Sequence, residues 1–410
     1  MADAAAPPRE VFRLSMLIYD SRYRSMTIQI VVLILFLLGF FWLANNARLN
    51  LEALGKPIDF TFIGQTAGYD INQTLIEYDS TYSHGRATLV GLLNTLLVAV
   101  MGCLTATLIG LVGGVLRLSN NWLISRIVIL YVEIFRNVPV LLWIVVAMLS
   151  IASALPNPRA FRGENPEASM ILFDTVAATN RGIYIPRPFL ENGLGSAGLN
   201  FLFLAAVIAA GIFFMRWNNK RAAKIQIETG IRPTTIWMNL AALIVPFVIL
   251  MIVMGLSFEK PELRGFNFQR GIRMQAPLIG VWLGLSLYTG TYIVEIVRSG
   301  IMAVSKGQSE ASAALGIRPG LTMSLVILPQ ALRVIIPQLI SQYLNLTKNS
   351  SLGVAVGYAD LVATLGTTTL NQSGREMETI LLLMAIYLTI SLTISGVMNW
   401  YNRSVQLVGR

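Results

Sequence analysis

Apolar residues gather in eight long runs that carry almost no charge, and polar segments separate these runs. The runs cover approximately residues 28–44, 88–113, 127–152, 197–215, 236–257, 276–297, 321–345 and 379–400. A run of about 17 or more apolar residues is long enough to cross a hydrocarbon core of about 30 Å as a helix. The pattern therefore predicts an all-α integral membrane protein with about eight transmembrane helices.

Two parts of the pattern are less regular. The seventh run contains Pro329 and Pro337, and proline is tolerated within a span only where neighbouring groups satisfy the freed backbone. A further apolar stretch at 352–370 is rich in Gly and Thr. We interpret it as a short half-helix or re-entrant segment rather than a ninth span.

Charge predicts the orientation of the spans. Only 13% of the residues are charged, whereas soluble domains carry about 25%. With the N-terminus inside, the cytoplasmic segments hold 16 Lys and Arg against 5 acids, and the external segments hold 13 against 14. Cytoplasmic loops are the ones enriched in Lys and Arg. We therefore expect both termini in the cytoplasm, and the net charge of +10 does not indicate nucleic-acid binding.

The motifs of catalysis are absent from the sequence. No G-x-x-x-x-G-K-[ST] run occurs, and the pair Gly55 and Lys56 is followed by Pro57. Without a phosphate-cradling loop the chain has no visible means of binding a nucleotide. The single histidine, His84, is interpreted as an ordinary loop residue. We expect no enzymatic activity, no metal and no cofactor in this chain.

The segment after the sixth run carries the most informative pattern. Residues 309–315 predict a short helix of small residues, and Gly316 suits the turn that ends it. Small side chains let another surface approach the backbone closely, and Glu310 offers one directional contact to a basic partner. A plain surface turn between two spans is the alternative.

This segment resembles the signature loop of ABC importer permeases, E-A-A-x-x-x-G followed by I-x-L-P. Ser312 stands where the family usually has alanine, which is a mild change. The resemblance implies that the following residues couple the permease to an ATPase: Gly307, Glu310, Ala311, Ser312, Leu315, Gly316, Leu328 and Pro329.

Further segments resemble the polar amino acid branch of that family, namely 91–95, 131–139, 291–300, 306–308 and 348–352. They imply a five-span type I permease core at 88–152 and 276–402, interrupted by an insertion at 153–275 with two extra spans. Residues 1–87 add a cytoplasmic segment, a first extra span and a periplasmic loop, and 403–410 form a cytoplasmic tail. The enlarged layout resembles the Q-type permease subunits of bacterial general L-amino acid importers.

The resemblance also implies the function and the partners. It predicts a permease subunit of the bacterial inner membrane that imports polar or general L-amino acids. A periplasmic amino-acid-binding protein delivers the substrate. A second, similar permease completes the path, and the resemblance predicts a heterodimer of the two permeases. A cytoplasmic ABC ATPase dimer binds ATP and Mg²⁺. Membrane lipid surrounds the spans.

Polar groups within the spans are candidates for the substrate path. Ionisable residues in spans are costly and suggest function, but Glu133 with Arg136, and Glu295 with Arg298, also have the spacing of intrahelical ion pairs. Hydrogen bonding between spans is the alternative for the uncharged groups. The candidates are Glu133, Arg136, Thr289, Tyr292, Glu295, Gln338, Gln342, Asn345, Lys348, Asn349 and Ser350.

An ion-coupled secondary amino acid transporter is the main alternative function. It would need in-membrane carboxylates placed for coupling and internal inverted repeats. No convincing repeat occurs in the sequence, and the acids in spans stand beside arginines. The importer permease is therefore the favoured prediction.

Overall fold

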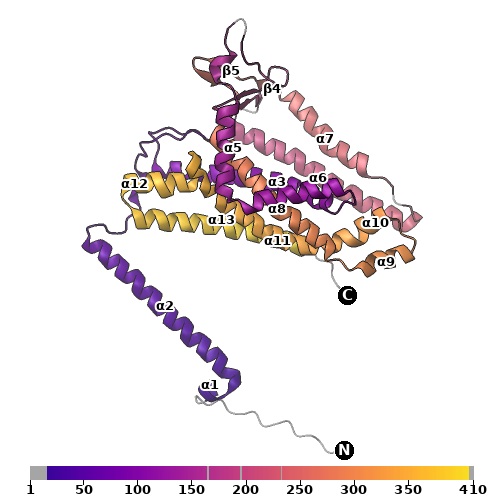
Figure 1. Cartoon of the computed structure of the whole chain (residues 1–410), viewed down its shortest axis with the longest axis horizontal. Helices are drawn as coiled ribbons and strands as arrows, with labels where there is room; N and C mark the ends of the chain where they lie inside the picture. Colours follow the sequence, from indigo (N-terminus) through magenta and orange to yellow (C-terminus); the bar gives the residue numbers. More distant parts are fainter. Residues whose placement is uncertain (1–15, 164–165, 194–195, 232, 406–410) are drawn as a thin grey trace, which may run out of the picture.

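The computed structural model describes residues 16–163, 166–193, 196–231 and 233–405, and most of them are helical (Figure 1). Parts of the predicted N-terminal segment and C-terminal tail lie outside these residues. The α-helices are α1 (Met16–Tyr19), α2 (Ser21–Ala53), α3 (His84–Arg117), α4 (Trp122–Asn137), α5 (Val140–Ala154), α6 (Ala197–Thr229), α7 (Ile236–Val253), α8 (Ala276–Met302), α9 (Lys306–Ala314), α10 (Pro319–Thr322), α11 (Leu328–Asn349), α12 (Leu370–Ser373) and α13 (Glu376–Val405).

The other elements are short. The 3₁₀ segments are η1 (Thr61–Gly64), η2 (Pro158–Phe161) and η4 (Ser350–Val356), and the π-helical segments are η3 (Met323–Ile327) and η5 (Val362–Thr369). The strands are β1 (Ala177–Thr179), β2 (Gly182–Ile185), β3 (Arg187–Leu190), β4 (Leu256–Glu259), β5 (Glu262–Arg264), β6 (Asn267–Gln269) and β7 (Ile272–Gln275).

Seven described helices are long and apolar enough to cross a membrane, and one bent pair of helices can add an eighth crossing. This confirms the predicted fold class of about eight transmembrane helices. The seventh predicted span is continuous as Pro319–Val356. The π-helical turn η3 precedes Pro329. There the helical hydrogen-bond pattern must accommodate a residue without an N–H group. Residues 352–370 comprise most of η4, a short link, η5 and the first residue of α12, and they do not form a ninth span.

The predicted third span, 127–152, corresponds to two helices with a sharp bend between them and not to one straight helix. α4 and α5 meet at an angle of 104°. The break falls at Val138, which has the extended angles φ −110° and ψ 134°, and Pro139 follows it. Proline disfavours a helical conformation in the residue before it, so the helix ends there and a new helix starts at Val140.

Contacts across the chain show that this bent pair crosses the membrane once. Gln275, directly before α8, donates its backbone N–H to Gln73 Oε1 at 3.2 Å and its side-chain amide to the Asn72 carbonyl at 2.5 Å. α3 and α8 therefore begin on the same side, which we call the strand side. β2 pairs with β7, so the segment after α5 also lies on the strand side. Because α3 ends on the opposite side, α4 and α5 must return the chain, which gives eight crossings.

α8 is the central helix. It packs against α3, α4, α5 and α11, and two thirds of its apolar window is buried. Small residues permit the close approach: a Cβ atom at Gly110 of α3 would collide with Ile293, and one at Gly284 of α8 would lie 2.8 Å from the Ile144 Cα atom of α5. Such small residues are typical of helix interfaces in membranes.

Strands on the strand side are an addition to the all-α prediction. β1, β2 and β7 form one antiparallel sheet, β3 pairs with β4, and β5 pairs with β6. Ala177, Tyr184 and Phe268 form a small buried core there. We call residues 155–163, 166–192 and 254–275 the β module. Alternate burial along β1 and β2 is the pattern of a half-buried sheet, but runs of three or four residues are too short to stand out in sequence.

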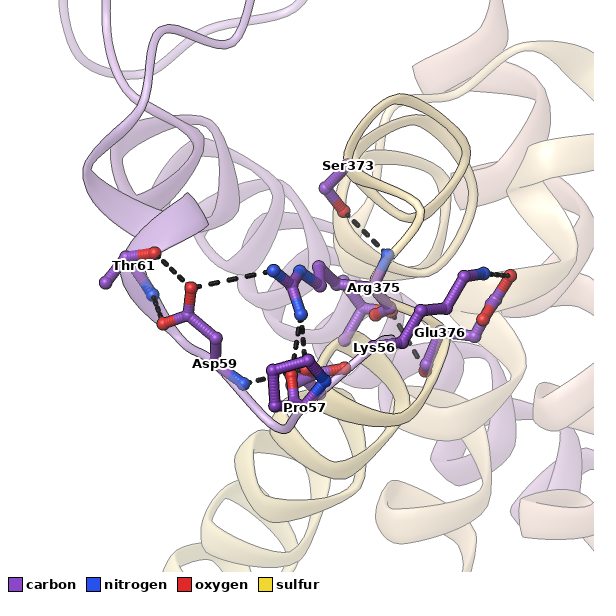
Figure 2. Close-up of polar contacts among 9 residues, drawn as sticks. Lys56, Pro57, Asp59, Thr61, Ser373, Arg375 and Glu376 are labelled. Atoms are coloured by element: carbon purple, nitrogen blue, oxygen red, sulfur yellow. Dashed lines mark hydrogen bonds and ion pairs between the residues drawn. The ribbon is translucent and has the colours of Figure 1, made fainter. Parts of the chain in front are cut away.

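α2 extends away from the other long helices (Figure 1), and none of its apolar window is buried. Figure 2 shows how the segment after α2 meets the start of α13. Arg375 Nη1 donates to the Pro57 carbonyl at 2.7 Å, and its Nη2 atom lies 3.6 Å from Asp59 Oδ2. Lys56 Nζ lies 3.5 Å from Glu376 Oε1, and the Asp59 N–H donates to Glu378 Oε1 at 2.9 Å. We call this set the Arg375 cluster.

Candidate functional site

α9 is the short helix predicted after the sixth run, and it starts three residues earlier than predicted, at Lys306. Gly316 follows its C-cap with φ 69°. The Gly316 N–H donates to the Ala313 carbonyl at 2.9 Å, and the Ile317 N–H donates to the Ser312 carbonyl at 3.0 Å. This pair of bonds is the Schellman motif. Gly316 therefore ends α9 as predicted, because it adopts a left-handed conformation without a steric penalty.

The exposed and buried faces of α9 are distinct. Ser312 is its buried residue, and its hydroxyl donates to the Gln308 carbonyl at 2.8 Å. Gly307, Glu310, Ala311 and Gly316 are exposed, and Leu315 is 78% exposed. Ser312 thus faces the protein and not a partner, because α9 packs against α10 and η3. The exposed face is left with one acid and several small or apolar side chains.

Leu328 and Pro329, the other predicted coupling residues, begin α11 directly after η3. Leu328 is exposed and Pro329 is half-buried. Since α9 packs against η3, a displacement of α9 has a direct mechanical route to the start of α11. α8 gives a second route, because only Ala303, Val304 and Ser305 separate its end from α9.

A pocket of about 370 Å³ lies between α4, α8 and α11. It brings together five of the predicted path residues from these three helices. Its lining residues are Arg136, Tyr292, Glu295, Ile296, Ser299, Gln338, Ser341 and Gln342. The guanidinium and the two amides offer hydrogen-bond donors, and the carboxylate and the two amides offer acceptors. The arrangement is therefore able to hold a small zwitterion or anion.

The predicted pairing of Glu133 with Arg136 is wrong. Glu133 Oε2 accepts from Asn137 Nδ2 at 3.2 Å, and the Arg136 guanidinium lies over the ring of Tyr292, 4.9 Å from its centre. Among the described residues no ion pair joins the two. A guanidinium is attracted to an aromatic face, so Arg136 turns to the neighbouring helix and Glu133 stays outside the pocket.

The second predicted pair is present and has an additional member. Arg298 Nε lies 3.1 Å from Glu295 Oε2, as the spacing of three predicted. Arg117 at the end of α3 also pairs with Glu295. Sequence analysis did not identify Arg117, and no local signal could have done so, because its partner lies 178 positions further along the chain. Ser299 and Ser341 of the pocket were missed for the same reason.

The remaining path candidates lie elsewhere. Thr289 is buried within α8, Asn345 and Lys348 are exposed, and Asn349 is half-buried at the end of α11. The Ser350 hydroxyl is buried and donates to the Thr347 carbonyl at 2.8 Å. None of these five side chains lines the pocket. A polar residue in a span is thus a weak guide to the pocket when its helix face is unknown.

His84 is not a loop residue, which corrects its interpretation. It is the first residue of α3, it is buried, and its Nδ1 atom lies 3.1 Å from Thr369 Oγ1. Within the described part of the chain, no group of three or more His, Cys, Asp or Glu side chains could hold a metal ion. His84 instead connects α3 to the segment before α12.

Comparison with known proteins gives consistent similarities. A model of the family described as binding-protein-dependent transport system inner membrane component matches residues 232–407. The chain is 53% identical to the glutamate/glutamine/aspartate/asparagine transport system permease protein BztB of Rhodobacter capsulatus, over all of both chains. It is 43% identical to the general L-amino acid transport system permease protein AapQ of Rhizobium johnstonii, over 96% of this chain and 94% of that one. A solved structure of an amino acid ABC transporter with histidines aligns with a TM-score of 0.44 at 18% identity, over 78% of this chain and 95% of that one.

Proposed function

The chain belongs to the family of binding-protein-dependent transport system inner membrane components, as a permease subunit of an amino acid ABC importer, and from this premise we propose that it carries acidic amino acids and their amides through the pocket between α4, α8 and α11. As a permease subunit it is not an enzyme, and ATP hydrolysis belongs to a separate subunit. A substrate-binding protein is the other general partner of such a permease.

The observation that carries the proposed substrate class is the composition of the pocket. Arg136 supplies a cation that can bind a carboxylate, and guanidinium–carboxylate hydrogen bonds are among the strong ones. Gln338 and Gln342 supply both donors and acceptors, which suit a side-chain amide as well as a carboxylate. The name of the relative that is 53% identical, which specifies glutamate, glutamine, aspartate and asparagine, supports the same class.

We propose that the exposed face of α9 binds the ATPase. Glu310 provides a directional contact, and Gly307, Ala311 and Gly316 allow the partner to approach the backbone. Leu315 offers an apolar contact at the end of the helix. Ser312, together with Leu328 and Pro329, supports α9 from within and transmits its displacement. ATP and Mg²⁺ then bind to the partner, and this chain holds no cofactor.

The orientation and the domain division are part of the same proposal. The excess of Lys and Arg in the segments opposite the strand side supports a cytoplasmic position for α9 and for both termini. The strand side then faces the periplasm across the inner membrane. Residues 88–152 and 276–402 form the permease core, 153–275 form the insertion with α6 and α7, and 1–87 carry the additional span α2. A second, similar permease completes the path as a heterodimer.

Uptake by a reconstituted importer tests this proposal. The chain is assembled in liposomes with its ATPase, second permease and binding protein. We expect labelled glutamate and glutamine to accumulate only when ATP is supplied on the ATPase side. Accumulation driven by an ion gradient with this chain alone would instead indicate a secondary transporter. ATP-dependent uptake of an unrelated solute, with neither amino acid carried, would refute the substrate class and retain the permease role.

A further inference from the structure

A tight turn in the β module presents two apolar side chains to solvent. Ile171 and Val176 close the turn, since the Ile171 N–H donates to the Val176 carbonyl at 2.8 Å and the Val176 N–H donates to the Ile171 carbonyl at 3.1 Å. The Thr175 hydroxyl donates to the Leu172 carbonyl at 2.5 Å. These bonds define the conformation of the intervening residues Leu172, Phe173 and Asp174, which we call the apex.

The apex has an unusual backbone. Leu172, Phe173 and Asp174 have φ angles of 52°, 59° and 56°. Residues other than glycine adopt positive φ rarely, and three in succession are under steric strain. Such strain persists where the surrounding structure enforces it and is concentrated at functional positions. The turn therefore indicates a selected shape and not merely a short connection.

The side chains at the apex do not contribute to the fold of the β module. Phe173 is 96% exposed and Leu172 is 66% exposed. The module has its own core of Ala177, Tyr184 and Phe268. Exposing two large apolar groups side by side is unfavourable in water, so a contact that buries them would stabilise the bound state.

A polar groove belongs to the same segment. It has a volume of about 580 Å³, and its lining includes Arg159, Arg162 and Glu167. The Ala168 N–H donates to the Ala160 carbonyl at 3.0 Å. This bond attaches the segment before the apex to a residue of the groove. The Arg159 guanidinium lies 5.5 Å from the centre of the Phe266 ring. The groove and the apex thus belong to neighbouring parts of the chain and together offer an aromatic side chain and polar groups of both charges, which is the composition of a protein–protein interface.

The β module is directly continuous with α8. β2 pairs with β7 over four residues, from Gly182 with Gln275 to Ile185 with Ile272. β7 ends at Gln275 and α8 begins at Ala276 without a loop. α8 carries Tyr292 and Glu295 of the pocket and leads to α9. A contact on the β module is therefore linked to α8, and through α8 to the pocket and to α9, by the pairing of β1 with β2 and of β2 with β7.

We propose that the apex, with Phe173 as the anchor and the Arg159–Glu167 groove as its polar flank, is a docking surface for the soluble binding protein of this importer. This inference rests on the proposed function, because it requires the strand side to face the periplasm. The binding protein must approach from that side to deliver the amino acid. The groove carries both positive and negative side chains, which favours a folded protein over a lipid surface as the occupant.

The test measures how strongly the binding protein binds the assembled importer in nanodiscs, with Phe173→Ser compared with wild type. We expect roughly fivefold to thirtyfold weaker binding, the range typical of losing an aromatic anchor. ATPase activity without binding protein should be unchanged, and so should stimulation at saturating binding protein. Phe173→Tyr keeps the ring and should restore binding, which separates loss of the anchor from misfolding.

Phe258→Ser is the matched control, because Phe258 is also an exposed aromatic residue of the β module but lies on β4. Equal affinity of Phe173→Ser and Phe258→Ser would overturn the proposal. Quenching of a fluorophore at position 173 by nitroxide lipids, unaffected by binding protein, would overturn it in favour of a membrane contact. If binding protein fails to stimulate even the wild type, the proposed function fails instead.

Discussion

The Arg136 guanidinium of α4 lies over the ring of Tyr292 of α8, 4.9 Å from its centre. This contact joins α4, the first helix of the bent pair, to the central helix α8 at the pocket. Because the ring holds the cation without neutralising it, Arg136 keeps its charge available to a bound anion. The Tyr292 hydroxyl is in turn 2.9 Å from the Tyr288 hydroxyl, which fixes the ring.

Replacing this cation should impair transport of the acidic substrates more than transport of their amides. We expect Arg136→Gln to raise the KM for glutamate by about tenfold to a hundredfold, because a hydrogen bond to a charged group contributes about 1.5–3 kcal/mol. The KM for glutamine should change little. Competition for uptake in the reconstituted importer measures both constants.

Arg126→Gln is the control for that change. Arg126 lies on the same helix, over Trp122 and outside the pocket. An equal loss for glutamate and glutamine in Arg136→Gln, or an equal loss in Arg126→Gln, would show that Arg136 positions the helix and does not select the substrate.

Reversing the charge on α9 should uncouple the importer. Glu310 is exposed on α9, and a like-charge contact with a basic partner costs several kcal/mol. Glu310→Arg should therefore weaken assembly with the ATPase by at least about tenfold. Pull-down of the ATPase and its stimulation by loaded binding protein provide the readouts. Glu228→Arg makes the same reversal at an exposed position of α6 and should leave both unchanged.

Gly91 permits a close crossing between α3 and the segment before η5. A Cβ atom there would lie 2.9 Å from the Asp360 carbonyl oxygen and would also collide with Thr364 Oγ1. Overpacking of this kind costs about 1–3 kcal/mol, so Gly91→Ala should lower the thermal midpoint in nanodiscs. Gly39→Ala meets no atom within 4 Å and should not lower it. Equal midpoints for the two variants would contradict the close crossing.

The Arg375 cluster should respond to acid in a defined direction. Hydrogen bonds from the Thr61 side chain and backbone lower the pKa of Asp59 below its ordinary value of 3.8. A carboxyl whose pKa is lowered by folding stabilises the folded contact above its unfolded pKa and loses that contribution as pH falls through the folded pKa. The charge of Arg375 also lowers the pKa of Asp59, so protonation of Asp59 below about pH 3.8 should weaken the contact between the segment after α2 and the start of α13, which is intact at neutral pH.

Spin labels at positions 54 and 380, in a background without Cys103, measure that separation. Asp59→Asn should widen the distance distribution already at neutral pH, since it removes the charge that faces Arg375. Glu52→Gln neutralises a carboxylate that pairs with Arg48 within α2 and should have no effect. A distribution that is unchanged in Asp59→Asn would mean that the other contacts of the cluster suffice.

Local features of the sequence predicted the helical spans and the end of α9. A helix that spans lipid makes its backbone hydrogen bonds within itself. One uninterrupted apolar run is therefore enough to locate it in the sequence. Gly316 ends α9 because only its own φ and the bonds of the last turn are involved. The span predicted at 127–152 is bent at a position with an available local signal, since Pro139 disfavours a helical Val138.

The sequence by itself thus determined the membrane class, the number of crossings and the family signature around Glu310, because each depends on residues close together in the chain. The tertiary structure alone decided which polar residues share a pocket. Spacing of three equally favoured Glu133–Arg136 and Glu295–Arg298, yet only the second pair formed, because Tyr292 offered Arg136 an aromatic face and Arg117 joined Glu295 from another helix. A helical period gives the face on which a side chain lies, and only packing gives what that face meets.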